Sequence, residues 1–334
     1  MTTRNAPLRT AATTLRAVAL CCGLAAAAAT AAPAHAASEE ARTKYPVVLV
    51  HGLLGFDNVL GIDYFYRIPG TLAEAGAKVY VAKVSAANTS EIRGEQLLKE
   101  LRTLRALSKN PSQKYNLIGH SQGSPTARYV AAVQPDLVAS VTSVSGLNGG
   151  SGVADLLASP SMNLLLHVVV LPLINNWTGK TNFLSGSNAN LRPDEPLGAL
   201  ASLTTASGAA FNAKYPQGRP APGASCDVKS GPAVVNGVRY YSWSGASTGY
   251  SLLDPTDFLL AAIGNMVFGG QPNDGMLATC STRLGTHLGD YRHNHLDTIN
   301  HVLGNTQHGL FSYREKAVPE IFKEHAVRLK NAGL

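Results

Sequence analysis

The sequence predicts an α/β fold with a mostly parallel sheet and helices on both faces. Short apolar runs at residues 45–50, 78–84 and 138–144 have the length and β-branched content of buried strands. Residues 90–107 lie between two of these runs and repeat apolar side chains at the spacing of an amphipathic helix. Strands that alternate with helices are typical of a parallel sheet that is covered on both sides.

Further elements follow from local signals. Residues 68–75 predict another helix, and Ser90 is the expected N-cap of the helix that begins beside it. The Asn236-Gly237 pair lies between two β-rich runs and predicts a hairpin. We expect the second run, residues 238–243, to join the main sheet. With 334 residues, of which 45% are hydrophobic and 15% charged, the chain can bury a sizeable core.

The first 36 residues have the pattern of a secretory signal peptide. Arg4, Arg9 and Arg16 form a basic start, and an alanine-rich apolar stretch follows at residues 17–32. Ala34-His35-Ala36 matches the small-x-small pattern of a cleavage site. A membrane anchor is the alternative, which the small residues and the cleavage pattern disfavour. We therefore expect an exported protein whose folded domain is residues 37–334.

Charge and cysteine content narrow the function classes. Removal of the signal takes away three arginines and no acids, so the formal net charge falls from +7 to +4. That mild excess, without a basic run interleaved with aromatic residues, does not indicate nucleic-acid binding. Cys226 and Cys280 are then the remaining cysteines. In an oxidising compartment they predict one disulfide, and two free buried thiols are the alternative.

The pentapeptide at residues 119–123, Gly-His-Ser-Gln-Gly, has the G-x-S-x-G pattern. It follows an apolar run and precedes a predicted helix at residues 125–133. This is the setting of the nucleophile elbow of α/β hydrolases, which presents a serine, here Ser121, on a sharp turn. Gly119 and Gly123 are expected because larger side chains would collide at the turn. The alternative is a glycine-rich turn with an incidental serine.

The loop at residues 51–55 follows the first predicted strand and contains two glycines. In α/β hydrolases, such a loop supplies half of the oxyanion hole. We expect the amide of Leu53 to be one donor and the amide of Gln122, directly after the nucleophile, to be the other. A simple β-turn is the alternative for this loop.

A nucleophilic serine needs a histidine as base and a carboxylate that orients the histidine. In this fold the chain order is serine, acid, histidine. Spacing alone does not choose among Asp254, Asp257, Asp274, Asp290 and Asp297, or among His287, His293, His295, His301, His308 and His325. Asp274 and His295 are favoured because both lie in predicted loops.

Residues 155–184 form an unusual segment between predicted strands. Residues 164–174 are strongly apolar, but His167 and Pro172 interrupt them and they are too short to span a membrane. A helical lid over an apolar cleft would have this composition. An ordinary pair of core helices is the alternative.

Longer motifs add to this reading. They are VHGLLGFDN at 50–58, TSEIRGEQL at 89–97, FNAKYPQG at 211–218, YSWSG at 241–245, NDG at 273–275 and NHLD at 294–297. On these motifs the chain, from residue 44 to residue 334, resembles the secreted true lipases of bacterial lipase family I. Within that family it resembles subfamilies I.1 and I.2, the Pseudomonas and Burkholderia type of triacylglycerol lipase.

The resemblance implies an α/β-hydrolase fold with one catalytic site and one disulfide. The implied residues are Ser121, Asp274 and His295 as the triad, the amides of Leu53 and Gln122 as the oxyanion hole, and Cys226–Cys280 as the disulfide. It also implies that a dedicated foldase assists export of the enzyme. One departure is Ser124, where the family usually has a second glycine.

The resemblance further implies one structural calcium ion (Ca²⁺). Its ligands would be the carboxylates of Asp254 and Asp297 and the backbone carbonyls of His301 and Asn305. The family usually has glutamine where this chain has His301, and a carbonyl ligand can survive that change. The alternative for Asp254 is that it only caps the helix that begins near Pro255.

The expected function is therefore that of a secreted serine hydrolase acting on triacylglycerols at an oil–water interface through an acyl-enzyme. We expect no stable membrane insertion. An esterase, or a depolymerase of aliphatic polyesters such as polyhydroxyalkanoate or polylactide, is the alternative with the same triad. A non-catalytic binding protein of this fold is a further alternative, which the intact triad set disfavours.

Overall fold

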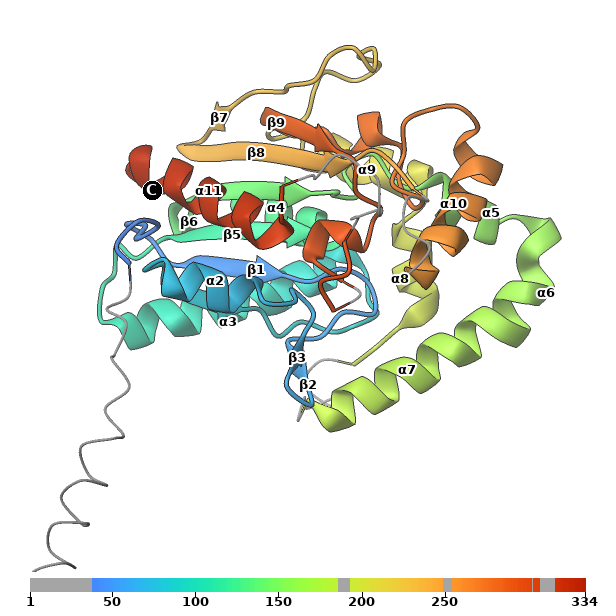
Figure 1. Cartoon of the computed structure of the whole chain (residues 1–334), viewed down its shortest axis with the longest axis horizontal. Coiled ribbons are helices and arrows are strands. Elements are labelled where there is room, and N and C mark those ends of the chain that lie inside the picture. The colour runs from blue at the N-terminus through green and yellow to red at the C-terminus, as the bar shows by residue number, and fades with distance from the viewer. Residues whose placement is uncertain (1–37, 186–192, 249–253, 302, 307–315) are drawn as a thin grey trace, which may run out of the picture. The chain divides into compact units, whose positions relative to one another are not determined.

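Parallel strands form the centre of the structure (Figure 1). In the order in which they pair, the strands are β4 (Val79–Val81), β1 (Val47–Val50), β5 (Tyr115–His120), β6 (Val138–Val144), β8 (Val238–Gly245) and β7 (Val234–Val235), and β9 (Thr286–Tyr291) also pairs with β8. Every pair is parallel except β7 with β8. The predicted mostly parallel sheet is confirmed, and the carboxyl ends of β1, β5 and β6 meet at one edge.

The computed structural model describes residues 38–185, 193–248, 254–301, 303–306 and 316–334. The predicted signal peptide, residues 1–36, lies outside these ranges. From Ser38 to Leu334 the chain forms one compact unit.

Strand β1 contributes to two cores. Val48 and Val50 pack on one face of the sheet with α3 (Ser90–Ser108) and α4 (Gly123–Val133). Val47 and Leu49 pack on the other face with α2 (Ile68–Glu74) and α11 (Val318–Asn331), which lie in front of the sheet in Figure 1. Because both faces of the strand are covered, its residues are apolar without interruption.

Local chemistry sets the ends of the elements. The side chain of Thr89 accepts a hydrogen bond from Ile92 N at 3.3 Å, so Thr89 is the N-cap of α3. The prediction of Ser90 as the cap was wrong by one residue, because the helix already begins at Ser90. Asn236 and Gly237 have φ angles of 52° and 76°, as the predicted tight hairpin between β7 and β8 requires.

The loops at the carboxyl ends of the strands contain most of the remaining helices. They are α5 (Gly152–Leu157), α6 (Asn163–Leu165), a π-helical turn (Leu166–Val170), α7 (Leu171–Leu184), α8 (Pro196–Ser202), α9 (Thr205–Lys214) and α10 (Pro255–Phe268). Short 3₁₀ turns lie at Pro135–Leu137, Pro160–Met162, Thr279–Thr282 and Asp297–Ile299. A two-stranded ribbon, β2 (Asn58–Val59) with β3 (Ile62–Asp63), follows β1. A disulfide joins Cys226 to Cys280.

Candidate active site

Ser121 lies on a strained turn between β5 and α4. Its φ is 53°, in the left-handed region that side chains other than Asn and Asp rarely adopt. A Cβ on Gly119 would lie 2.3 Å from Gly123 O, and a Cβ on Gly123 would lie 2.0 Å from Val50 O. The expected strand–turn–helix geometry is present, and these backbone contacts explain why both flanking residues are glycine.

His295 and Asp274 come together from two loops. His295 Nδ1 lies 2.8 Å from Asp274 Oδ2, and because a carboxylate accepts, Nδ1 donates. Asp274 is fully buried, and its Oδ1 accepts from the amides of Met276 and Leu277 at 3.0 and 2.8 Å. The other ring nitrogen, Nε2, therefore keeps its lone pair, which is what a general base requires.

The reacting atoms of Ser121 and His295 are both free. Among the described residues, neither the Ser121 hydroxyl nor His295 Nε2 has a hydrogen-bond partner. Ser121 is partly exposed and His295 is 7% exposed. Catalytic hydrogen bonds are often long without substrate and shorten in the substrate complex, so this arrangement is compatible with a serine–histidine pair.

The peptide that joins Ser121 to Gln122 is fixed through its oxygen. Ser121 O accepts from Ser124 N at 3.1 Å and from Leu147 N at 3.0 Å. In a trans peptide the N–H points away from the C=O, so the Gln122 N–H points to the opposite side. Within the described ranges this N–H has no acceptor. It is a preorganised donor beside Ser121.

The peptide that joins Gly52 to Leu53 is fixed in the same way. Gly52 O accepts from Gly55 N at 3.3 Å and lies 3.0 Å from His51 Nδ1. The Leu53 N–H has no acceptor in the part of the chain that the structure describes. A Cβ on Gly52 would lie 2.8 Å from the Cβ of Ser121, so this loop approaches the elbow closely. Both predicted oxyanion donors are thus amides without an acceptor among the described residues.

A buried cation, Arg93, joins the two segments that contain these peptides. Its guanidinium donates to the side-chain oxygen of Gln122 and to the carbonyl of His51. Burial lowers the pKa of Arg93 to about 10, and burial together with the charge of Arg93 lowers the pKa of His51 to about 3. No role for Arg93 was predicted from the sequence. Its position four residues before Leu97, on the buried stripe of α3, is the signal that could have found it.

The other triad candidates have different partners. Asp257 accepts from Asn294 Nδ2 at 2.7 Å, Asp290 pairs with Arg283, His287 contacts Ser242, and His325 Nε2 lies 2.7 Å from Thr142 Oγ1. The His293 ring stacks on Tyr291 and the His301 ring lies near Tyr64. His308 lies outside the described residues. Of the candidate acids, Asp274 is hydrogen-bonded to His295.

The two aspartates predicted to bind calcium each have one buried oxygen without a partner. Asp254 Oδ1 accepts from Thr256 N at 2.8 Å and caps α10, as the alternative expected. Asp297 Oδ2 accepts from Asn294 N at 3.0 Å. The second oxygens, Asp254 Oδ2 and Asp297 Oδ1, have no hydrogen-bond partner among the described residues. Capping and metal binding would therefore use different oxygens of Asp254.

Electrostatics at this place favour a cation. Burial, together with the negative charges of Asp257 and Asp254, raises the pKa of Asp297 to about 8. Over the described ranges, no three or more His, Cys, Asp or Glu residues are grouped to bind a metal. The predicted ligand set is of another kind, because two of its four members, His301 and Asn305, would contribute backbone carbonyls.

The predicted lid segment packs over the loop that follows β1. Leu166, Leu171 and Ile174 are buried in an apolar cluster against which Leu54 packs. Trp177 Nε1 donates to the carbonyl of Leu54 at 2.9 Å, one residue after the predicted oxyanion donor. The π-helical turn places Leu166 and Leu171, five residues apart, on the same buried side.

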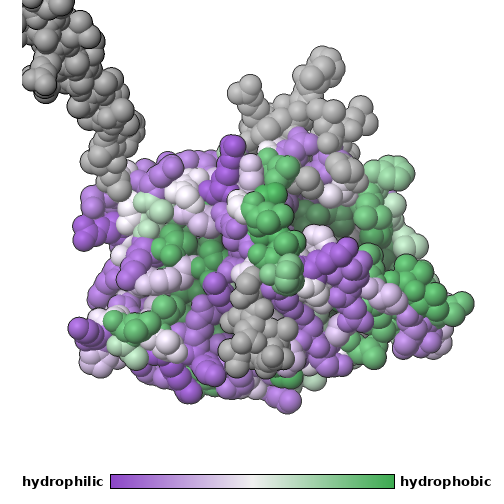
Figure 2. All heavy atoms as spheres, turned by 90° about the horizontal axis from the view of Figure 1, so that it is seen from below, coloured by the Kyte–Doolittle hydropathy of each residue, from purple (hydrophilic) through white to green (hydrophobic). Residues whose placement is uncertain are grey.

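The other side of this segment exposes apolar side chains. Those that are at least 40% exposed are Leu164, Leu165, Val168, Val169, Leu173, Trp177, Phe183 and Leu184. Figure 2 shows hydrophobic atoms gathered on the side where Figure 1 places α6 and α7. None of the helices in the described ranges has the length and apolar content needed to cross a membrane. A contiguous exposed apolar patch is typical of a surface that binds lipid or protein.

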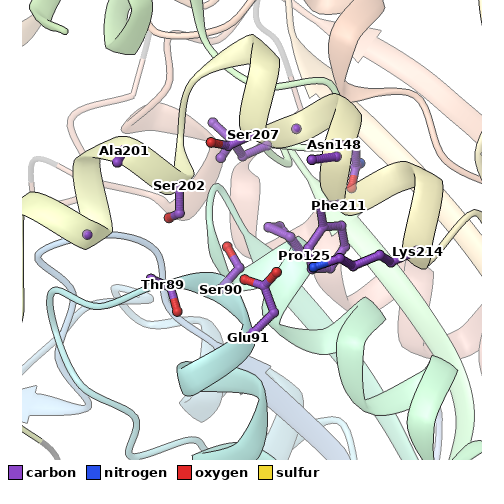
Figure 3. A pocket seen from close by; sticks show the side chains of 14 residues that line it. Thr89, Ser90, Glu91, Pro125, Asn148, Ala201, Ser202, Ser207, Phe211 and Lys214 are labelled. Carbon is purple, nitrogen blue, oxygen red and sulfur yellow. The ribbon is translucent and has the colours of Figure 1, made fainter.

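A pocket of about 510 Å³ lies beside the elbow and contains none of the predicted triad (Figure 3). Its walls come from the start of α3, from α4, and from α8 and α9. Leu147 in its lining donates its amide N–H to Ser121 O, and Ser202 accepts from Gln122 Nε2 at 3.2 Å. The pocket therefore adjoins residues that hold the elbow in place.

Comparison with known proteins identifies the family. The family described as alpha/beta hydrolase fold matches residues 45–245. A triacylglycerol lipase of Vibrio cholerae is 50% identical over 90% of this chain and 93% of its own length. The chain belongs to the bacterial triacylglycerol lipases. A triacylglycerol lipase of Pseudomonas fragi is 44% identical, over 89% of this chain and 99% of its own.

A solved structure supports the fold. The lipase of Staphylococcus hyicus superposes with a TM-score of 0.57 at 17% identity, over 89% of this chain and 99% of that one. At that identity the likeness concerns the fold alone. The family and the α/β-hydrolase fold expected from the sequence are both confirmed.

Proposed function

We propose that this chain hydrolyses the ester bonds of triacylglycerols, with Ser121 as nucleophile, His295 as base and Asp274 as the group that orients His295. The observation that supports this most strongly is the 2.8 Å hydrogen bond between His295 Nδ1 and Asp274 Oδ2 in a chain that holds Ser121 on an elbow. Membership of the family supports the substrate class.

The reaction follows from this arrangement. Ser121 Oγ attacks the ester carbonyl carbon while His295 Nε2 takes its proton, and Asp274 stabilises the imidazolium. The amides of Leu53 and Gln122 donate to the oxyanion, each contributing about 3–4 kcal/mol by comparison with another serine hydrolase. The alcohol leaves with the proton from His295. Water, activated by His295, then attacks the acyl-enzyme and releases the fatty acid.

One experiment tests the substrate class and its alternative together. We expect the purified enzyme to hydrolyse an emulsion of long-chain triacylglycerol faster than a soluble short-chain ester or a polylactide film. A serine-directed phosphonate should label Ser121 and stop all three reactions in parallel. Preference for the film or for the soluble ester would favour a polyester depolymerase or an esterase. Labelling at another residue would overturn the assignment of Ser121.

We also propose one structural calcium ion at Asp254 and Asp297. Two buried carboxylate oxygens that have no partner in the described part of the chain support it, because calcium takes hard oxygen ligands. The carbonyls of His301 and Asn305 would complete the protein ligands. When bound, the ion would supply positive charge that holds the carboxylates together. Asp297 lies two residues after His295, so a fixed Asp297 also fixes the loop that presents the base.

We propose that residues 155–184 act as a lid. Their buried side covers the loop of Leu53 and their outer side is apolar, which suits closure in water and insertion at an oil surface. We further propose export directed by residues 1–36 and assisted by a foldase. The basic and alanine-rich composition of that segment and the Cys226–Cys280 disulfide support export, and the family resemblance supports the foldase. Replacing residues 1–36 with methionine should keep the enzyme inside the cell.

A further inference from the structure

A chain of buried hydrogen bonds connects the loop of the predicted oxyanion hole to the predicted base. Gly52 N lies 3.2 Å from Tyr64 Oη, Tyr64 Oη lies 2.8 Å from His120 Nδ1, and His120 Nε2 lies 3.0 Å from His295 O. Gly52, Tyr64, His120 and His295 are all buried. The links join residues that are 12, 56 and 175 positions apart in sequence.

The chemistry of the end groups fixes the direction of every bond. A carbonyl oxygen accepts, so His120 Nε2 carries a hydrogen and donates to His295 O. In a neutral imidazole the other nitrogen accepts, so Tyr64 donates its hydroxyl to His120 Nδ1. The oxygen of Tyr64 then accepts from Gly52 N. Burial, with the nearby His295 adding, lowers the pKa of His120 well below its usual value, which keeps this ring neutral.

We propose that Tyr64 and His120 are positioning residues that set the oxyanion loop and the catalytic histidine at a fixed distance from each other. Gly52 directly precedes Leu53, so a bond to Gly52 N holds the peptide that leads to the oxyanion donor. The bond to His295 O holds the backbone of the base, while Asp274 holds its ring. His120 also precedes the nucleophile and its ring contacts the ring of His295, with centroids 4.6 Å apart.

The inference rests on the roles of Leu53 and His295 proposed above. The positioning roles can nevertheless fail while the proposed function stands. The chain of bonds touches no substrate, so its loss should act on the transition state through misplaced groups and lower kcat with little change in KM. A residue that only stabilises the fold would instead lower Tm and leave kcat per titrated active site unchanged.

The first variant removes one atom. Tyr64→Phe keeps the ring contacts with His51 and Phe65 and deletes the hydroxyl. We expect kcat for a soluble ester, per phosphonate-titrated site, to fall about tenfold, with KM within about twofold of the wild type. Tyr66→Phe is the matched control, because the Tyr66 hydroxyl has no hydrogen-bond partner among the described residues. It should behave as the wild type.

Variants of His120 complete the test. His120→Gln retains a donor that can reach His295 O and should keep more activity than His120→Leu, which retains none. In the double variant Tyr64→Phe/His120→Leu, the loss should not exceed that of His120→Leu alone, because both changes break one chain. The proposal would be overturned if the fold-losses in kcat of the two single variants multiplied in the double variant, or if Tyr64→Phe had wild-type kcat.

Two results keep the inference separate from the proposed function. An inactive Ser121→Ala enzyme together with unchanged kcat in Tyr64→Phe would remove the positioning roles and leave the triad in place. An active Ser121→Ala enzyme would remove the triad itself. If the His120 variants do not fold, Tyr64→Phe against Tyr66→Phe decides the question alone.

Discussion

Among the described residues, two sets of serine, histidine and aspartate can be compared. The first is Ser121, His295 and Asp274. In the second, Ser242 Oγ lies 3.1 Å from His287 Nδ1, and His287 Nε2 lies 3.0 Å from Asp290 Oδ1. His287 and Asp290 were also triad candidates by sequence, so the two sets show what separates a catalytic set from a structural one.

In the second set, the serine is buried and the aspartate is paired with a cation. Ser242 is fully buried in β8, and its hydroxyl oxygen accepts from Leu284 N at 3.1 Å. Arg283 donates to both oxygens of Asp290, at 2.6 and 2.9 Å, and neutralises its charge. With burial opposing them, the hydrogen bonds of His287 and Arg283 hold the pKa of Asp290 well below its usual value.

In the first set, the serine is accessible and the groups that a reaction would use are not engaged by other residues of the described chain. Within the described residues, Ser121 stands on an elbow beside two amides without acceptors, and Asp274 receives hydrogen bonds from amides and from His295 but contacts no cation. The difference teaches that three residue types in contact do not make a triad. Access to the serine, free donors beside it and an uncompensated carboxylate behind the histidine make one.

Alanine at each serine should give the largest contrast. Ser121→Ala should lower turnover by about a millionfold, as removal of the nucleophile does in another serine hydrolase, without a change in fold. Ser242→Ala should leave kcat unchanged and cost about 1 kcal/mol of stability, because Leu284 N loses its acceptor. Ester hydrolysis and thermal unfolding of both variants check this. A folded Ser121→Ala enzyme with a tenth of wild-type activity would end the distinction.

Asparagine at each aspartate should give the next contrast. In Asp274→Asn the oxygen can keep its bonds to the amides of Met276 and Leu277, which turns the NH₂ group toward His295 Nδ1. That nitrogen must then accept, and the proton moves to Nε2, where it blocks the base. We expect kcat to fall on the order of 10⁴-fold, as for the same change in a serine protease.

The matched change, Asp290→Asn, should act on stability alone. It leaves Arg283, whose side chain is 5% exposed, without its carboxylate partner. We expect a loss of about 1–3 kcal/mol, below the value for a fully buried pair because Asp290 is partly exposed. Turnover per titrated site should match the wild type. A large fall in turnover would show that the second set also serves catalysis.

A smaller contrast is expected from the way in which the backbone of His287 and that of His295 are held in place. His287 is part of strand β9, whereas His295 lies in a turn, two residues before Asp297. If calcium binds there, a chelator should lower Tm by about 5–10 °C at calcium levels near a hundred times Kd. Calcium should restore Tm and magnesium should not. Asp254→Asn should be insensitive to the chelator, and equal Tm in all samples, with no calcium in the purified enzyme, would remove the site.

The same comparison shows what the sequence could and could not predict. The sheet, the elbow around Ser121 and the hairpin at Asn236 depend on patterns within a few residues, and all three were predicted. Predicted loop positions favoured Asp274 and His295, but the family resemblance was needed to choose them, because loop conformation decides which acid meets which histidine. Arg93, Tyr64 and His120 were missed because their partners are distant in the chain. Helical spacing can mark a buried position such as Arg93, but the partners that give such a residue its role become visible only in the folded chain.

The last contrast concerns the cover over the first set. Trp177 of the predicted lid donates to Leu54 O, and Trp177→Phe removes this bond but keeps an aromatic ring beside Phe56. If the bond holds the lid closed, its loss of about 0.5–1.5 kcal/mol raises the open population about two- to tenfold. Activity on a soluble monomeric ester should rise by that factor. Activity on a saturating triacylglycerol emulsion, where the oil surface already opens the lid, should stay within about twofold of the wild type. Rates on both substrates for the two enzymes decide the matter, and an equal change on both would show that Trp177 acts on the site itself and not through closure.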